Sequence, residues 1–192
     1  VLNSGKVPAP ARIIQDEVVG PSLGQESINA GLISFVIAFI LVLLYMALFY
    51  STAGWLADLA LVTNVFLLMG VLVSFGAVLT LPGIAGIILT IGMAVDANVL
   101  IFERMREEVK NGRSIKDAVE SGFSIAWGTI IDSNLTTLIA AAVLFYFGSG
   151  PVRGFAVTLA IGIATSMFTS VTVTRLIIAA WFNRYKPKAL PI

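Results

Sequence analysis

The sequence contains no cysteine and no histidine, and it has few charged residues. Without these residues there are no disulfides, no thiolate nucleophile, no Ser-His-Asp triad and none of the common zinc sites. Charged residues make up 12% of the chain and the formal net charge is +1, so no strong field attracts nucleic acid. Proton chemistry would have to use carboxylates, and we expect no metal, no cofactor and no enzymatic catalysis.

Apolar residues are abundant instead: they form 58% of the 192 residues, and the mean hydropathy is +0.96. A helix needs roughly 20 apolar residues to cross a bilayer, and five stretches reach that length. We therefore predict an all-α polytopic membrane protein with five transmembrane helices. Short connections would make neighbouring helices antiparallel. The predicted spans cover residues 28–50, 58–79, 83–102, 127–147 and 154–181.

The connection at 103–126 differs from the others because it holds five basic and five acidic residues. Asn111 and Gly112 predict a break in it, and Ser114 with Asp117 makes a capping pair. Apolar residues recur at helical spacing after the break, so we predict an amphipathic helix lying on the membrane surface.

Basic residues predict the orientation. The loop 103–126 and the tail 182–192 together hold eight, against three on the other side, which are Lys6, Arg12 and Arg153. By the positive-inside rule the loop and tail are cytoplasmic. Residues 1–27 would then be the end of an external, periplasmic-side segment, and an insertion signal would lie upstream of Val1.

Two aspartates lie inside predicted spans, each in an Asp-small-Asn triplet: Asp96 with Asn98, and Asp132 with Asn134. A carboxylate in a membrane is costly and usually faces a bundle interior or water. Arg175 has a similar predicted depth, about 8 to 11 Å from the inner helix ends. If the three charges converge, Arg175 would keep one carboxylate ionised while the other titrates, as a proton relay requires.

Purely structural roles for the same three charged residues are the alternative to a proton relay. Asp132 could cap the start of its span, Arg175 could snorkel to the headgroups, and Asp96 could hydrogen-bond a nearby asparagine. Thr136 is a further polar support. Gly92 and Gly162 are candidate helix-packing positions, and Gly162 belongs to a stripe of small residues spaced by four, which predicts close packing within the bundle or against another subunit. The stripe is Gly154, Thr158, Gly162, Ser166, Ser170 and Thr174.

Several segments resemble the membrane part of the SecD family of protein-export factors, in the resistance-nodulation-division superfamily. They are GPSLG at 20–24, LPGIAG at 81–86, GMAVDANVLIFER at 92–104 and DSNLTTL at 132–138. The resemblance covers essentially the whole chain. It implies that these are spans two to six of six, and that Asp96 matches the proton-pathway aspartate of the family.

The resemblance also implies a role in the bacterial inner membrane. A SecD-like subunit works with SecF, separate or fused, beside the SecYEG channel, and uses the proton motive force to move preproteins outward. One alternative is a proton-coupled small-molecule exporter of the same superfamily. An alternative of another class is an intramembrane aspartyl protease, in which Asp96 and Asp132 would share a proton.

Overall fold

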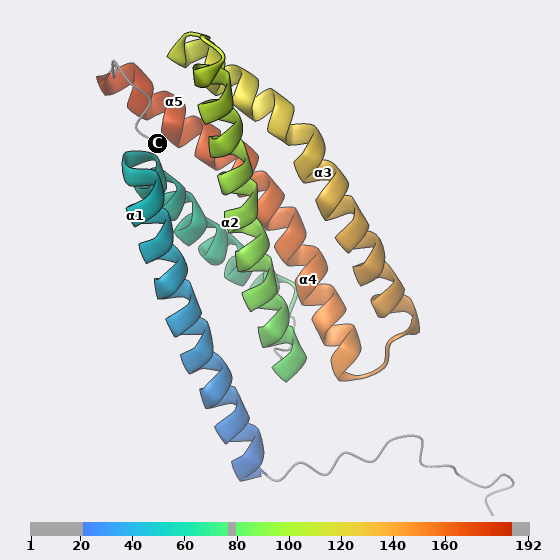
Figure 1. The fold of residues 1–192 in the computed structure, drawn as a ribbon. Coiled ribbons are helices and arrows are strands. Elements are labelled where there is room, and N and C mark those ends of the chain that lie inside the picture. Colours follow the sequence, from blue (N-terminus) through green and yellow to red (C-terminus); the bar gives the residue numbers. More distant parts are fainter. Residues whose placement is uncertain (1–20, 77–79, 186–192) are drawn as a thin grey trace, which may run out of the picture.

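The computed structural model describes residues 21–76 and 80–185. Within these ranges the chain is helical and contains no strand, which confirms the predicted all-α class. Most of the predicted external segment and basic tail, residues 1–20 and 186–192, lies outside the described residues, as does the end of the predicted span 58–79. Figure 1 shows long helices that run alternately up and down side by side.

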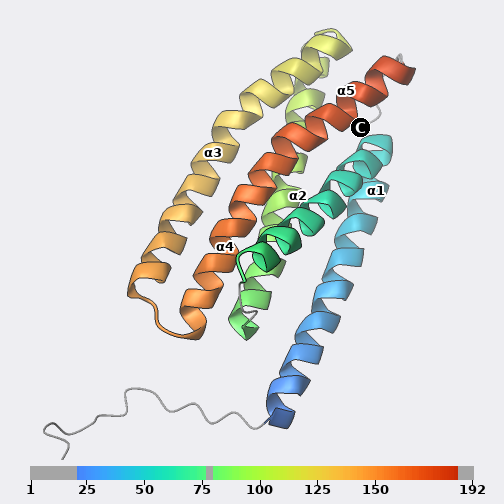
Figure 2. The ribbon, with the colours of Figure 1, turned by 180° about the vertical axis from the view of Figure 1, so that it is seen from behind.

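Helix α1, Pro21–Ser74, is 54 residues long and reverses at Ser51, whose φ is 50° and ψ −125°. The first arm rises along one side of the bundle and the second returns past α2 (Figures 1 and 2). A Cβ at Gly54 would lie 2.0 Å from the carbonyl oxygen of Met46, so only glycine permits this close a reversal. The predicted connection 51–57 is reduced to this single kink.

The number of separate helices therefore differs from the prediction. In the described chain four helices are long and apolar enough to cross a membrane, not five. The first of them, Gln25–Ser74, contains the predicted span 28–50 and most of the span 58–79.

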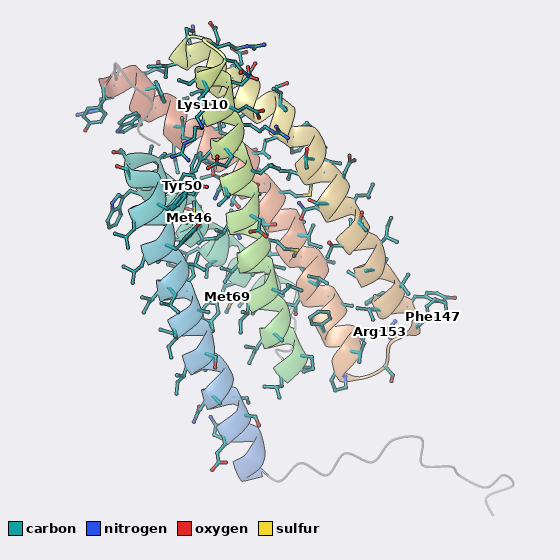
Figure 3. The ribbon with its side chains drawn as sticks, in the orientation of Figure 1. Met46, Tyr50, Met69, Lys110, Phe147 and Arg153 are labelled. Atoms are coloured by element: carbon teal, nitrogen blue, oxygen red, sulfur yellow. The ribbon has the colours of Figure 1, made fainter. Side chains whose placement is uncertain are left out.

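Helix α2, Leu81–Lys110, begins with a cap in which Thr80 Oγ1 accepts a hydrogen bond from the Gly83 amide at 3.2 Å. It continues eight residues beyond the predicted span end at 102 and stops at Asn111. Gly112 follows with φ 86°, which confirms the predicted break. Figure 3 shows Lys110 at this end of the bundle and Phe147 and Arg153 at the opposite end.

Helix α3, Ile115–Phe147, is capped by Ser114, which accepts from the Asp117 amide at 3.3 Å. This confirms the capping pair. The expected separate surface helix is not formed, because residues 115–126 continue directly into the predicted span 127–147. Its apolar face packs on the extension of α2: a Cβ at Gly122 would lie 3.0 Å from the Met105 amide nitrogen. Protein contacts bury the Ala118, Gly122, Phe123 and Ala126 part of that face.

The last helical segment is continuous and consists of α4, Pro151–Phe168, the π-helical turn η1, Thr169–Val173, and α5, Thr174–Tyr185. The predicted small-residue stripe lies against α2. A Cβ at Gly162 would lie 2.3 Å from Thr90 Cγ2, and a Cβ at Gly154 would lie 2.7 Å from Thr80 Oγ1. Packing within the bundle therefore accounts for the stripe.

The larger apolar core lies between α1, α2, the start of α3 and α5, and a smaller one lies between α3 and α4. Tyr50 at the kink is 2% exposed and its ring lies 5.4 Å from that of Phe102. Its hydroxyl donates to Glu103 Oε1 at 3.1 Å. The kink is thereby attached to α2 at the point where α2 becomes charged.

Candidate functional site

Asp96 lies in a groove between α2 and α3 with a volume of about 280 Å³. The Asp-small-Asn triplet at 96–98 contributes Asp96 to the groove, and the triplet at 132–134 contributes Ser133 and Asn134. The complete lining is Met93, Asp96, Ala97, Leu100, Ile130, Ser133, Asn134 and Thr137. One carboxylate thus faces a row of polar groups on the neighbouring helix.

The polar groups of α3 are bonded to their own backbone. Asn134 Nδ2 donates to the Ile130 carbonyl at 2.8 Å, and Ser133 Oγ donates to the same carbonyl at 3.2 Å. Thr137 Oγ1 donates to the Ser133 carbonyl at 3.1 Å. The Asp96 side chain is exposed and has no hydrogen bond or ion pair with any described residue.

Asn98, two residues after Asp96, points to the other side of α2. It is 3% exposed, and its Oδ1 accepts a hydrogen bond from Thr174 Oγ1 at 3.1 Å. The same hydroxyl lies 3.2 Å from the Thr169 carbonyl, at the start of the π-helical turn. Asn98 therefore ties the Asp96 segment of α2 to the junction of η1 and α5.

Asp132 does not line the groove. Its side chain is exposed, and its carbonyl accepts from the exposed Thr136 hydroxyl at 2.9 Å. Asp132 and Ser133 are adjacent, so their side chains point about 100° apart around α3. Because Ser133 faces α2, Asp132 is turned away.

Arg175 does not join the carboxylates either. Its guanidinium carbon lies 6.0 Å from the centre of the Phe123 ring, and it forms no ion pair with any described residue. Thr174 occupies the position that faces α2, so the next side chain points toward the start of α3. The predicted convergence of three charges is absent from the described bundle.

The two glycines predicted for packing behave differently. Gly162 lies at the close contact with Thr90 described above, whereas a Cβ at Gly92 would meet no atom within 4 Å. Gly92 instead lines a hollow of about 190 Å³ with Phe35 and Phe39 of the first arm of α1. It is not a close-packing position among the described residues.

Two buried polar residues on the second arm of α1 were missed. Asp58 is 7% exposed and its Oδ1 has no hydrogen-bond partner among the described residues. Asn64 is fully buried, and neither atom of its amide has a partner there. Asp58 is the first residue of the predicted span 58–79, a position that does not indicate burial. The signal for Asn64 is its place between Ala57, Leu61 and Leu68, which share one buried face.

In residues 21–76 and 80–185 no three acidic, cysteine or histidine side chains come together as a metal site requires. The groove offers a single carboxylate, with hydroxyl and amide groups around it.

Residues 3–184 match the family described as "Protein export membrane protein SecD/SecF, C-terminal". The chain is 58% identical over 177 residues to "Protein translocase subunit SecD" of Desulfurispirillum indicum, covering 92% of this chain and 34% of that protein. It is 50% identical over 192 residues to the subunit of the same name from Acetobacter pasteurianus, covering 100% of this chain and 37% of that one. The chain thus spans little more than a third of the length of these relatives.

Solved structures agree with the sequence comparison. The fold is similar to the crystal structure of "SecDF, a translocon-associated membrane protein" from Thermus thermophilus, with a TM-score of 0.85 and 42% identity, covering 88% of this chain and 24% of that one. A SecDF crystal structure in a "Super-membrane-facing form" gives a TM-score of 0.80 and 43% identity, covering 86% and 23%. The chain belongs to the family of SecD/SecF protein-export membrane proteins, C-terminal part.

Proposed function

We propose that this chain is the membrane part of a SecD subunit that uses the proton motive force to promote preprotein export, and that Asp96 is the group that takes up and releases the proton. The observation that carries the proposal is the position of Asp96 within the apolar stretch of α2, in a groove that polar groups of α3 also line. The names of the relatives, which are protein translocase subunits, support the transport class.

The groove has the chemistry that proton uptake needs. A charged carboxylate is costly in hydrocarbon, so it must face water or a partner. A volume of about 280 Å³ has room for several waters, each of which occupies about 30 Å³ in the liquid. Ser133, Asn134 and Thr137 provide polar contacts for such waters. Protonation of Asp96 would neutralise its charge, so that the carboxyl group would no longer need these waters. A drier, tighter contact between α2 and α3 would then be favoured.

A route from Asp96 to the rest of the bundle begins two residues away. The Asn98–Thr174 hydrogen bond joins α2 to the junction of η1 and α5. π-helical turns are often found at functional sites. A shift of α2 when Asp96 changes charge would therefore move α5 relative to α4. This mechanical coupling is part of the proposal.

The topology follows from the two arms of α1. Each arm is long enough to cross a bilayer, so α1 would cross twice and the chain would make five crossings. In the sequence, the loop 103–126 and the tail 182–192 hold eight basic residues. We therefore place the loop and the carboxyl end in the cytoplasm of the bacterium and the amino end outside.

The partners we propose are SecF, the SecYEG channel and the translocating preprotein. The Asp96 groove opens at the surface of the bundle. This chain accounts for 24% of the SecDF chain it resembles. The remaining parts of a full-length protein and its SecF half are available to cover the groove and to complete a relay.

The alternative functions gain no support from the groove or from the relatives. An aspartyl protease needs two carboxylates that share a proton, whereas Asp132 does not line the groove. A small-molecule exporter is not favoured, because the relatives are named as translocase subunits. We therefore propose a non-enzymatic role.

The test is export into inverted membrane vesicles that contain the full-length protein with Asp96→Asn. The amide keeps the size of the side chain but cannot titrate. We expect the stimulation of export by a proton gradient to disappear while assembly with partner subunits is unchanged. Asp132→Asn is the matched control and should retain most of the stimulation. Full stimulation in the Asp96 variant would refute the proposed role.

A further inference from the structure

A second groove lies between the first turns of α3 and helix α5, and its lining includes none of the residues of the Asp96 groove. Its volume is about 600 Å³. Basic side chains come from both walls, Lys116 from α3 and Arg175 from α5, and Ser114 and Asn183 add neutral polar groups. Val119, Ala179 and Phe182 form an apolar part. The groove therefore has a charged region and an apolar region side by side.

The two cations are without ionic partners in the described chain. The ion pairs found there are Arg104 with Glu107 at 2.7 Å, Arg106 with Glu103 at 3.2 Å, and Arg113 with Glu108 at 2.7 Å. All three lie on α2 and the following turn. The groove itself contains one carboxylate, Glu120, which forms no ion pair either. Two positive charges and one negative charge leave an excess of one positive charge.

Arg175 is exposed, so its guanidinium group can receive an anion. Its guanidinium group lies over the Phe123 ring, with 6.0 Å between the guanidinium carbon and the ring centre. A guanidinium group directs its N–H groups outward in its own plane, where they can bind two phosphate oxygens. Lys116 on the facing helix can neutralise the same phosphate as a point charge.

The groove also lies at the level expected of lipid headgroups. Helix α5 ends with Trp181 and Tyr185, whose rings are 5.8 Å apart, and Trp181 contacts Phe182 of the groove with ring centres 5.4 Å apart. Tryptophan and tyrosine concentrate at membrane interfaces. The apolar side chains of the groove, Val119, Ala179 and Phe182, adjoin its charged region.

We propose that this groove binds an anionic phospholipid, with Arg175 and Lys116 on the phosphate and the lipid's apolar part against Val119, Ala179 and Phe182. Basic pockets between helices near the cytoplasmic face are suited to anionic headgroups. A free phosphate would use the charged region alone, whereas a lipid uses both regions. The inference goes beyond the proposed function, because it involves neither Asp96 nor proton movement.

The test is native mass spectrometry of the full-length protein in a non-ionic detergent, titrated with phosphatidylglycerol or with phosphatidylcholine. We expect one phosphatidylglycerol to bind at least about fivefold more tightly than phosphatidylcholine, since one basic residue near a membrane surface contributes about that factor. Lys116→Gln with Arg175→Gln should abolish the preference. Equal affinity for the two lipids in the unmodified protein, or a preference that persists in the double variant, would overturn the site.

Control variants distinguish loss of binding at this site from the effect of a lower net charge and from unfolding of the protein. Arg104→Gln with Arg113→Gln removes the same charge on the same side of the bundle, from ion-paired residues, and should keep the preference. Arg175→Lys should retain most of it. If the double variant unfolds, Lys116→Gln alone, at an exposed position, should lower the preference about fivefold. Loss of preference in the Arg104 and Arg113 variant contradicts a localised site.

A final competition experiment distinguishes binding of the lipid from binding of its phosphate group alone. Inorganic phosphate in large excess, at ionic strength matched with chloride, should not displace phosphatidylglycerol more than chloride does. Displacement by phosphate alone would overturn the lipid assignment.

Discussion

The first arm of α1 and helix α2 differ in how their composition relates to burial. The most apolar 18-residue stretch of the described chain is in α1, and 6% of its residues are buried. The corresponding stretch of α2 is less apolar, yet half of it is buried. In water the more apolar helix would be inside. In a bilayer, lipid surrounds leucine as well as protein does, so small and polar residues occupy the interior instead.

The contacts of α2 show why it is central. It contacts α1, α3 and α4. Gly83, Gly86 and Thr90 form the face against α4, and Asn98 forms the contact with α5. Between residues 25 and 50 of α1, by contrast, only Met46 and Tyr50 are buried. The comparison predicts that substitutions on α2 and its neighbours matter far more than those on the first arm.

The largest expected effect is at the contact between α4 and α2. Gly162→Ala should lower the free energy of unfolding by about 3 kcal/mol, because its Cβ would overlap a buried side chain. That side chain, Thr90, is fully buried and its hydroxyl donates to the Ile87 carbonyl at 2.9 Å, so it cannot easily move. Gly92→Ala is the matched control and should be neutral or gain up to about 1 kcal/mol of helix stability. Unfolding of the full-length protein in mixed micelles measures both, and equal losses would remove the distinction.

The next largest effect on stability is expected when buried and exposed leucines in the two arms of α1 are compared. Leu68 is fully buried, whereas Leu48 is 83% exposed. Leu68→Ala should cost about 2 kcal/mol, since the loss of apolar transfer energy is small in a bilayer and the cavity term remains. Leu48→Ala should change stability by less than about 0.5 kcal/mol. The same unfolding assay measures both variants, and a larger loss at Leu48 would mean that protein rather than lipid covers the first arm.

A smaller effect tests the link between α2 and α5. A double-mutant cycle with Asn98→Ala and Thr174→Val should give a coupling energy of about 0.6 kcal/mol, the average for hydrogen bonds between membrane helices. The Thr174 hydroxyl also has the Thr169 carbonyl within reach, which limits the loss. Strictly additive single effects would show that the bond contributes nothing to stability.

The smallest effect is expected at Asn64. An amide buried without partners destabilises the fold, so Asn64→Leu should leave stability unchanged or raise it by up to about 1 kcal/mol. Thermal unfolding of the full-length protein provides the measurement. A loss of more than about 1 kcal/mol would show that another part of the full-length protein, or a buried water, satisfies this amide.

Much of the local structure could be predicted from the sequence. The apolar stretches lie in helices, Asn111 and Gly112 end α2, and Ser114 caps α3. These features depend on residues that are close in the chain. The continuity of α3 was not foreseen, because it depends on Gly122 packing against Met105 of another helix.

The candidate site was predicted in part. Asp96 and Asn134 do share a groove, but Asp132 and Arg175 lie elsewhere. The π-helical turn before Thr174 explains part of this difference. It adds one residue to the helix, which rotates the following side chains by about 100° relative to a regular helix. An estimate of membrane depth that counts residues along a regular α-helix does not detect such a rotation.

The sequence by itself determined that the chain is helical, that it is apolar enough to cross a membrane and that histidine and cysteine take no part in its chemistry, because composition and short-range periodicity decide these properties. Only the tertiary structure decided which side of each helix faces a neighbour. That choice depends on the rotation of whole helices around their axes, which the glycine contacts, the kink at Ser51 and the π-helical turn set together.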